Sequence, residues 1–114
     1  MTLAEIAIFT DEVQSTTQFY EQLLGYAPVF HAPSIALFDV KGVKLLIHSR
    51  AANMVGGPPN EDHFAFAVKD LDAVCNTFIA QGHSLELAPR DYEWGRSAYL
   101  RDPNGRLVEL QQEK

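Results

Sequence analysis

The same strand-and-helix pattern occurs twice in this sequence. The apolar segment EIAIFT, residues 5–10, precedes a helical pattern over residues 11–25. The segment HFAFAV, residues 63–68, precedes a second one over residues 70–82. Short runs rich in Ile, Phe and Val are typical of strands, and apolar residues spaced by three and four are typical of helices. A chain that repeats this order is constrained to fold into two similar modules.

Both predicted helices have start and stop signals. Asp11 and Asp70 are good N-caps, and Gln14 stands where a capping box would place a partner for the first. Gly25 and Gly82 follow the last apolar residues and supply natural C-terminal stops. The apolar stripes consist of Val13, Thr17, Tyr20, Leu23 and Leu24 in the first helix and of Leu71, Val74, Phe78 and Ile79 in the second.

Three further strands are predicted after each helix, at residues 27–32, 34–40 and 43–48 and again at residues 84–88, 97–101 and 106–111. The last two strands of each copy meet at matching turns. FDVKGVKLLI aligns with RDPNGRLVEL, so that Asp39 corresponds to Asp102 and Gly42 to Gly105. The predicted fold is therefore α+β, with two βαβββ modules that form a curved mixed sheet around a cleft. The modules span residues 1–50 and 61–114 of a single domain, residues 1–114, with a linker at residues 51–60.

The composition excludes several classes of partner. The net charge is −6 and the isoelectric point is near 5.0, whereas binding to nucleic acid or to an anionic membrane needs clustered Lys and Arg. No apolar run approaches the roughly 20 residues of a membrane span, and no signal peptide is visible. The single cysteine, Cys75, cannot form an internal disulfide, so we expect a cytoplasmic protein.

Three motifs carry a resemblance to a known family. They are FYEQLLG at the end of the first helix, AFAVKDLDAV at the start of the second, and YLRDPNGRLVEL near the end of the chain. With the repeated modules, they resemble the vicinal oxygen chelate superfamily, which includes glyoxalase I, bleomycin-resistance proteins, fosfomycin-resistance enzymes and extradiol dioxygenases. The resemblance covers essentially the whole chain. It implies the fold more firmly than the activity, because the superfamily contains metal enzymes and metal-free drug-binding proteins.

The resemblance implies metal ligands on the first and last strands of each module. Glu5 and His63 occupy matching positions at the starts of the two modules, and Glu109 lies in the last strand of the second. The residue that corresponds to Glu109 in the first module is Leu46, which cannot bind a metal. His48 lies two residues further along the same strand, and a small register change would bring it into the ligand position. This donor set suits Zn, Ni, Fe, Mn or Co.

The residues themselves also single out Glu109. By strand alternation Leu107, Glu109 and Gln111 share one face, while Val108 and Leu110 share the apolar face that a helix would cover. Burying a carboxylate without a partner costs roughly several kcal/mol unless it is paired or protonated. Glu109 is therefore expected in the cleft.

Two functions compete. The first is a metal-dependent enzyme resembling glyoxalase I, a lyase or related enzyme that acts on a small oxygen-rich substrate, with Glu5 or Glu109 as general base. The second is a metal-free protein resembling the bleomycin-resistance group, which sequesters a drug in a cleft at a homodimer interface. Two departures count against other members of the superfamily. The segment RDYEWGRS stands where fosfomycin-resistance enzymes carry a serine- and glycine-rich cation loop, and Glu5 replaces a histidine typical of extradiol dioxygenases.

Nothing in the sequence supports a third function, that of a non-catalytic sensor. We expect a homodimer, which sedimentation at micromolar concentration would test.

Several side chains have two interpretations. Trp94, Arg96 and Tyr99 are candidate contacts to a substrate or drug, together with Tyr92, Phe30 and Phe38, although most of these aromatic residues could equally pack in the core or at its rim. Arg96 could instead pair with Glu93. Glu5 could be a solvated strand-edge residue, His63 could bond to Glu61 or Asp62, and His48 could be a polar strand end. His31 and His83 are expected at the surface.

Overall fold

The computed structural model describes residues 1–50 and 56–114, so residues 51–55 of the predicted linker lie outside the described part. The order strand, helix, strand, strand, strand occurs twice along the described chain, which confirms the predicted α+β class and the two βαβββ modules. The first copy consists of β1 (Thr2–Thr10), α1 (Val13–Leu24), β2 (Phe30–Ala32), β3 (Ile35–Val40) and β4 (Val43–Ser49). The second consists of β5 (His63–Val68), α2 (Leu71–Ala80), β6 (Leu87–Tyr92), β7 (Gly95–Arg101) and β8 (Leu107–Gln112).

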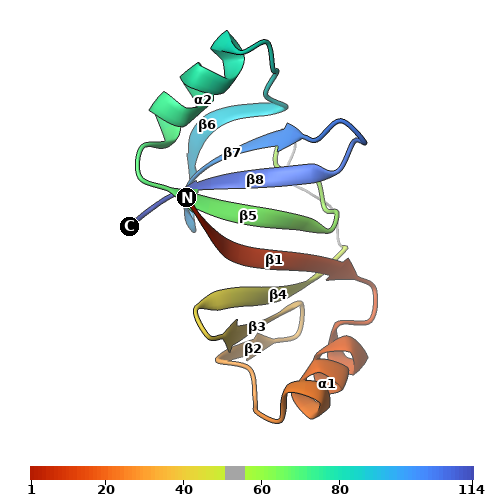
Figure 1. Ribbon diagram of the computed structural model, residues 1–114. Coiled ribbons are helices and arrows are strands. Elements are labelled where there is room, and N and C mark those ends of the chain that lie inside the picture. Colours follow the sequence, from red (N-terminus) through yellow and green to blue (C-terminus); the bar gives the residue numbers. More distant parts are fainter. Residues whose placement is uncertain (51–55) are drawn as a thin grey trace. The chain divides into compact units, whose positions relative to one another are not determined.

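The described chain divides into two compact units. The N-terminal module comprises Glu5–Asp62, and the C-terminal module comprises Met1–Ala4 together with His63–Lys114. In the N-terminal module the strand order is β2-β3-β4-β1, and in the C-terminal module it is β5-β8-β7-β6 (Figure 1). The pairs β1–β4 and β5–β8 are parallel and the other pairs are antiparallel, so each module has a mixed sheet.

The parallel strand pair of each module has an equivalent register. In the N-terminal module Ala7 of β1 lies opposite Leu46 of β4. In the C-terminal module Ala65 of β5 lies opposite Glu109 of β8. Leu46 therefore occupies the place in its own sheet that Glu109 occupies in the other, which agrees with the alignment of the two turns.

The turns that set this register are built alike. Gly42 and Gly105 have φ angles of 94° and 85°, a region that favours glycine. The carboxylate of Asp39 accepts a hydrogen bond from the backbone N–H of Gly42 at 3.0 Å. The carboxylate of Asp102 accepts hydrogen bonds from the backbone N–H groups of Asn104 and Arg106, both at 2.9 Å. The predicted correspondence of the two turns is confirmed.

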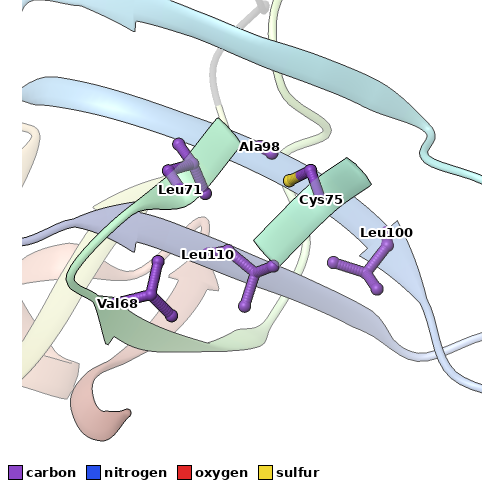
Figure 2. Packing of buried hydrophobic residues seen from close by; sticks show 6 residues of the cluster. All are labelled: Val68, Leu71, Cys75, Ala98, Leu100 and Leu110. Atoms are coloured by element: carbon purple, nitrogen blue, oxygen red, sulfur yellow. The ribbon is translucent and has the colours of Figure 1, made fainter. Parts of the chain in front are cut away.

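Each helix covers an apolar face of its own sheet. In the C-terminal module α2 contacts β6, β7 and β8, and Figure 2 shows side chains of the two layers packed together. This core consists of Val68, Leu71, Cys75, Ala98, Leu100 and Leu110. The corresponding core of the N-terminal module consists of Val13, Ala36, Phe38, Leu45 and Ile47. Each predicted apolar helix stripe includes one residue that does not pack in the core. These residues are Leu23 of α1 and Ile79 of α2, which are exposed.

The start of α1 differs from the prediction. Glu12 is its N-cap, with no side-chain hydrogen bond, so the expected capping by Asp11 is wrong. The hydroxyl of Thr10 accepts a hydrogen bond from the N–H of Glu12 at 2.9 Å, which delays the helix by one residue. Asp11 pairs with Arg50 at 3.6 Å, and Gln14 donates to the carbonyl of Pro33 at 3.2 Å instead of closing a capping box.

The start of α2 confirms the prediction and gives a test. Asp70 accepts a hydrogen bond from the N–H of Ala73 at 3.1 Å.

We expect Asp70→Ala to lower the free energy of unfolding by about 1 kcal/mol, because one N–H of the first turn loses its partner. Asp11→Ala is the matched control and should cost less than about 0.5 kcal/mol, because it removes only an exposed ion pair. Urea unfolding of both variants checks this, and equal losses would contradict the assignment of caps.

Strand β6 lies further along the chain than the predicted residues 84–88. It spans Leu87–Tyr92 and includes Pro89, with a register shift against β7 between Leu87 and Arg90. Proline lacks the N–H of a ladder hydrogen bond, which is tolerated in an edge strand or at a bulge. Because β6 is the last strand of its sheet, Pro89 does not end it. The segment that follows is consequently a tight hairpin turn at Glu93 and Trp94, where the sequence suggested a longer connection.

Candidate functional site

A buried histidine–carboxylate pair lies in the C-terminal module. His63 is the first residue of β5 and Glu109 lies in the neighbouring parallel strand β8. The Nε2 atom of His63 and the Oε1 atom of Glu109 are 2.9 Å apart. Their side chains are only 5% and 3% exposed. Both are on the sheet face opposite the α2 core. Glu109 alternates with the core residue Leu110 in β8, and His63 alternates with the core residue Val68 in β5. Glu109 thus lies on the strand face that side-chain alternation predicts, and its place in a cleft stays a prediction.

The second carboxylate oxygen of Glu109 has two donors of its own. The hydroxyl of Ser97, in β7, donates to Oε2 at 2.8 Å, and the side-chain amide of Gln111 donates to the same atom at 3.1 Å. Ser97 lies opposite Gln111 in the β7–β8 ladder, so the antiparallel pairing places both donors around the carboxylate. Every oxygen of this buried group is therefore hydrogen-bonded.

Two opposing effects set the ionisation of Glu109. Burial raises the pKa of its carboxyl group, while the hydrogen bonds from His63, Ser97 and Gln111 lower it. The hydrogen bonds prevail, and the pKa lies below the usual value of 4.5. Glu109 is consequently an anion at neutral pH despite its burial.

An ionised carboxylate beside an imidazole is a donor set for a transition metal. Each of the two residues offers one ligand atom. Divalent zinc and its neighbours accept both donor types, and bind the neutral form of histidine. The residues present in the C-terminal module therefore fit part of a metal site. The resemblance supplies the remainder as Glu5 and His48, which belong to the N-terminal module.

Glu5 lies at the boundary between the modules along the chain. It is the first residue of the N-terminal module and follows Ala4, the end of the short segment that belongs with His63 and Glu109. It is half-buried and pairs with Lys44 in the β1–β4 ladder. Because it alternates with Ile6, which packs on the α1 core, Glu5 is on the sheet face opposite the helix. Its role as a ligand stays a prediction.

His48 is half-buried on β4, two residues beyond Leu46 and on the same face of its sheet. Its Nδ1 atom is 2.8 Å from the carbonyl oxygen of Ser49, and its ring centroid is 5.4 Å from that of Phe9. A carbonyl accepts only, so Nδ1 donates this hydrogen bond, which leaves Nε2 as the candidate ligand atom. Its role as a ligand also stays a prediction.

The three predicted substrate contacts differ in their surroundings. Tyr99 is buried and lies edge-on to His63, with ring centroids 6.0 Å apart. Trp94 is 46% exposed and stacks on Tyr92, with centroids 4.5 Å apart and planes 5° apart. Tyr99 thus contacts the His63 ring directly, whereas Trp94 packs on Tyr92 at the surface. Their contact with a substrate remains a prediction.

Arg96 is committed to an ion-pair network within the C-terminal module. Its guanidinium donates to both carboxylate oxygens of Asp72 in α2, at 2.9 and 3.0 Å, and to Asp91 in β6 at 3.2 Å. This network replaces the alternative pairing with Glu93. It ties α2 to the β6–β7 hairpin, and a substrate contact by Arg96, still a prediction, would compete with it.

The remaining histidines lie at the surface, as expected. His31 contacts the side chain of Gln14 at 3.0 Å, and His83 stacks on Phe78 with centroids 4.0 Å apart. Sequence reasoning missed Ser97 and Gln111 as partners of Glu109. Gln111 shares a strand face with Glu109, which was a usable signal, whereas Ser97 is revealed only by the register of β7 against β8.

The family model described as Glyoxalase/Bleomycin resistance protein/Dioxygenase superfamily matches residues 2–110. The chain belongs to this superfamily. Membership confirms the predicted resemblance over almost the whole sequence. A search of curated proteins found no match. Within the described residues of this superfamily member, no helix is long and apolar enough to cross a membrane.

Solved structures of several differently named proteins share the fold. An NAD-dependent benzaldehyde dehydrogenase from Legionella pneumophila has a TM-score of 0.76 at 18% identity, covering 96% of this chain and 98% of that one. A glyoxalase/bleomycin resistance protein/dioxygenase superfamily member from Vibrio splendidus 12B01 has a TM-score of 0.74 at 15% identity, covering 95% and 96%. Methylmalonyl-CoA epimerase from Mycobacterium tuberculosis has a TM-score of 0.75 at 21% identity, covering 99% and 88%. At these identities the likeness shows the glyoxalase-like fold, and the names do not agree on one activity.

Proposed function

We propose that this member of the superfamily is a metal-dependent enzyme that acts on a small substrate with two neighbouring oxygen atoms. The observation that carries the proposal is the buried pair of His63 and ionised Glu109. Burying ionisable groups for packing alone is unfavourable, and an apolar residue of similar volume is often as stable or more so. Leu46 shows that the same register position in the other module is served by such a residue. A ligand role explains why the C-terminal module keeps a carboxylate.

The proposed ligands are His63, Glu109 and Glu5, with His48 as a fourth. Glu5 is supported by three observations within its own module and along the chain. It lies on the sheet face opposite the helix, it is half-buried, and it directly follows the segment that belongs with His63. One imidazole and two carboxylates suit Zn, Ni, Fe, Mn or Co, and the ion is a divalent cation of this group.

The chemistry proposed for the site is proton transfer at a carbon next to a carbonyl group. A bound divalent cation would supply positive charge that stabilises the negative charge developing on the substrate oxygens. Glu109 or Glu5 would accept the proton from the substrate carbon on a carboxylate oxygen and return it to the product. Tyr99 and Trp94 would border the substrate and limit the access of water. This chemistry serves a glyoxalase-like lyase, and equally an epimerase such as the one among the structures of similar fold.

The exposed aromatic stack of Trp94 on Tyr92 favours a second candidate, which is metal-free binding of a flat drug. That candidate gives no reason for the ionised state of Glu109 at 3% exposure. We therefore rank it below the enzyme. A homodimer and a cytoplasmic location stay predictions.

Metal analysis of protein purified without a histidine tag tests the proposal. We expect about one transition-metal ion per chain, because the ligands must be present together and deprotonated to bind it. His63→Ala should lose the ion, while His83→Ala, which removes an exposed histidine from the same module, should retain it. Wild-type protein that takes up no metal but binds a flat aromatic drug tightly would establish the second candidate instead.

A further inference from the structure

The only tryptophan of the chain is connected to Glu109 by two hydrogen bonds. The indole Nε1–H of Trp94 donates to the hydroxyl oxygen of Ser97 at 3.3 Å. The same hydroxyl donates to the Oε2 atom of Glu109 at 2.8 Å. Ser97 is fully buried, whereas Trp94 is half exposed. A single hydroxyl group therefore links a surface aromatic side chain to the buried carboxylate.

The direction of these hydrogen bonds is fixed by the groups involved. An indole N–H is a donor only and an ionised carboxylate is an acceptor only. The hydroxyl of Ser97 must therefore accept from Trp94 and give its one proton to Glu109. If that hydroxyl rotated away, both contacts would be lost together. Ser97 consequently has one favoured orientation as long as both neighbours are in place.

Packing holds the indole in position at the other end. Trp94 lies in the turn between β6 and β7, and its ring stacks on Tyr92 at 4.5 Å with the planes nearly parallel. The guanidinium of Arg90 lies 4.8 Å from the centroid of the Tyr92 ring and adds a cation–π contact on the same hairpin. These contacts order an aromatic side chain that would otherwise be mobile at a turn. The indole N–H can therefore act as a fixed donor.

We propose that Ser97 and Trp94 are positioning residues for Glu109. They hold Oε2 so that Oε1 stays directed to His63 and to the metal, and the indole senses the state of the carboxylate through the shared hydroxyl. The proposal rests on the metal-dependent function inferred above.

Ser97→Ala tests this positioning role. It removes the hydroxyl with little change in volume, and Glu109 keeps Gln111 as the donor to Oε2. We expect the Kd for Zn²⁺ and for Ni²⁺, measured by calorimetry, to rise by roughly 10- to 100-fold, which is typical for loss of a hydrogen bond to a metal ligand. The change in Trp94 fluorescence on metal addition should also disappear. Trp94→Phe keeps an aromatic ring on Tyr92 but lacks the N–H, and should raise the Kd in the same direction.

Thr17→Val is the matched control. Thr17 is buried in the N-terminal module and its hydroxyl donates to the carbonyl of Val13, so this change also removes one buried hydroxyl. Metal affinity and the fluorescence response should match the wild type. If Ser97→Ala keeps a Kd within about twofold of the wild type and retains the fluorescence response, the relay does not position Glu109.

A double-mutant cycle in metal-free protein separates this proposal from the metal function. Glu109→Gln should shift the emission of Trp94 when Ser97 is present, and should not shift it in the Ser97→Ala background, because the hydroxyl is the connection. Equal shifts in both backgrounds would overturn the relay even if metal binds. A wild type that binds no metal, with a cycle that behaves as expected, would overturn the metal function while the coupling of Trp94 to Glu109 stands.

Discussion

Glu109→Gln is expected to abolish tight metal binding while leaving the protein folded. The amide has the same shape as the carboxylate but no charge, so it is a much weaker ligand for a divalent cation. The loss should be at least the upper end of the roughly 10- to 100-fold range that follows loss of a hydrogen bond to a ligand. Metal affinity by competition with a chelator and urea unfolding of the metal-free protein measure the two effects separately.

The stability of the metal-free protein should respond much less to Glu109→Gln. The amide oxygen can still accept from His63 or from Ser97, so the cost is limited to the weakening of charge-assisted hydrogen bonds, about 1–3 kcal/mol. Removing a buried charge partly offsets that cost. Glu86→Gln is the matched control, because it removes the same charge from a surface ion pair with Arg101. It should leave metal affinity unchanged, and an equal loss in both variants would show that net charge governs the binding.

Phe38→Ala is expected to destabilise the protein strongly, more than Asp70→Ala or Glu109→Gln. Phe38 is fully buried in the core of the N-terminal module, with the ring of Tyr26 edge-on at 6.4 Å. Removing a buried phenylalanine ring costs about 3–5 kcal/mol, a large share of the roughly 5–15 kcal/mol by which proteins of this size are stable. The urea midpoint should fall accordingly, with little change in the slope.

Phe30→Ala is the control for Phe38→Ala. Phe30 lies on the edge strand β2 and its side chain is 55% exposed, so its removal should cost less than about 1 kcal/mol. Both residues were candidates for lining a drug cleft. A Phe38→Ala variant with wild-type stability and weakened binding of an aromatic ligand would show that Phe38 serves binding, and would contradict its place in the core.

The repeated turns made the register of the strands predictable from the sequence. Gly42 and Gly105 require the same backbone conformation, and counting from them matched Leu46 with Glu109, which occupy equivalent places in the two sheets. The alternation of side chains in β8 then identified the face of Glu109. These features are local, so the sequence shows them directly.

Features that depend on tertiary contacts were not predictable in this way. Asp11 is a residue type favoured at N-caps. However, the Thr10 hydroxyl accepts a hydrogen bond from the N–H of Glu12, and Glu12 is the N-cap of α1. Strand β6 was predicted too early in the chain, because Pro89 is tolerated within it only by virtue of its position at the sheet edge. The hydrogen bond from Ser97 to Glu109 depends on the register of a neighbouring strand, so Ser97 was missed.

The most direct test of the metal site is anomalous diffraction from crystals grown with an excess of Zn²⁺ or Ni²⁺, recorded at the absorption edge of the added metal. We expect a single strong peak bonded to His63 and Glu109, at the roughly 2.0–2.2 Å typical of nitrogen and carboxylate ligands, with Glu5 completing the set. No peak at His63 and Glu109, with their mutual hydrogen bond intact in the presence of excess metal, would contradict it.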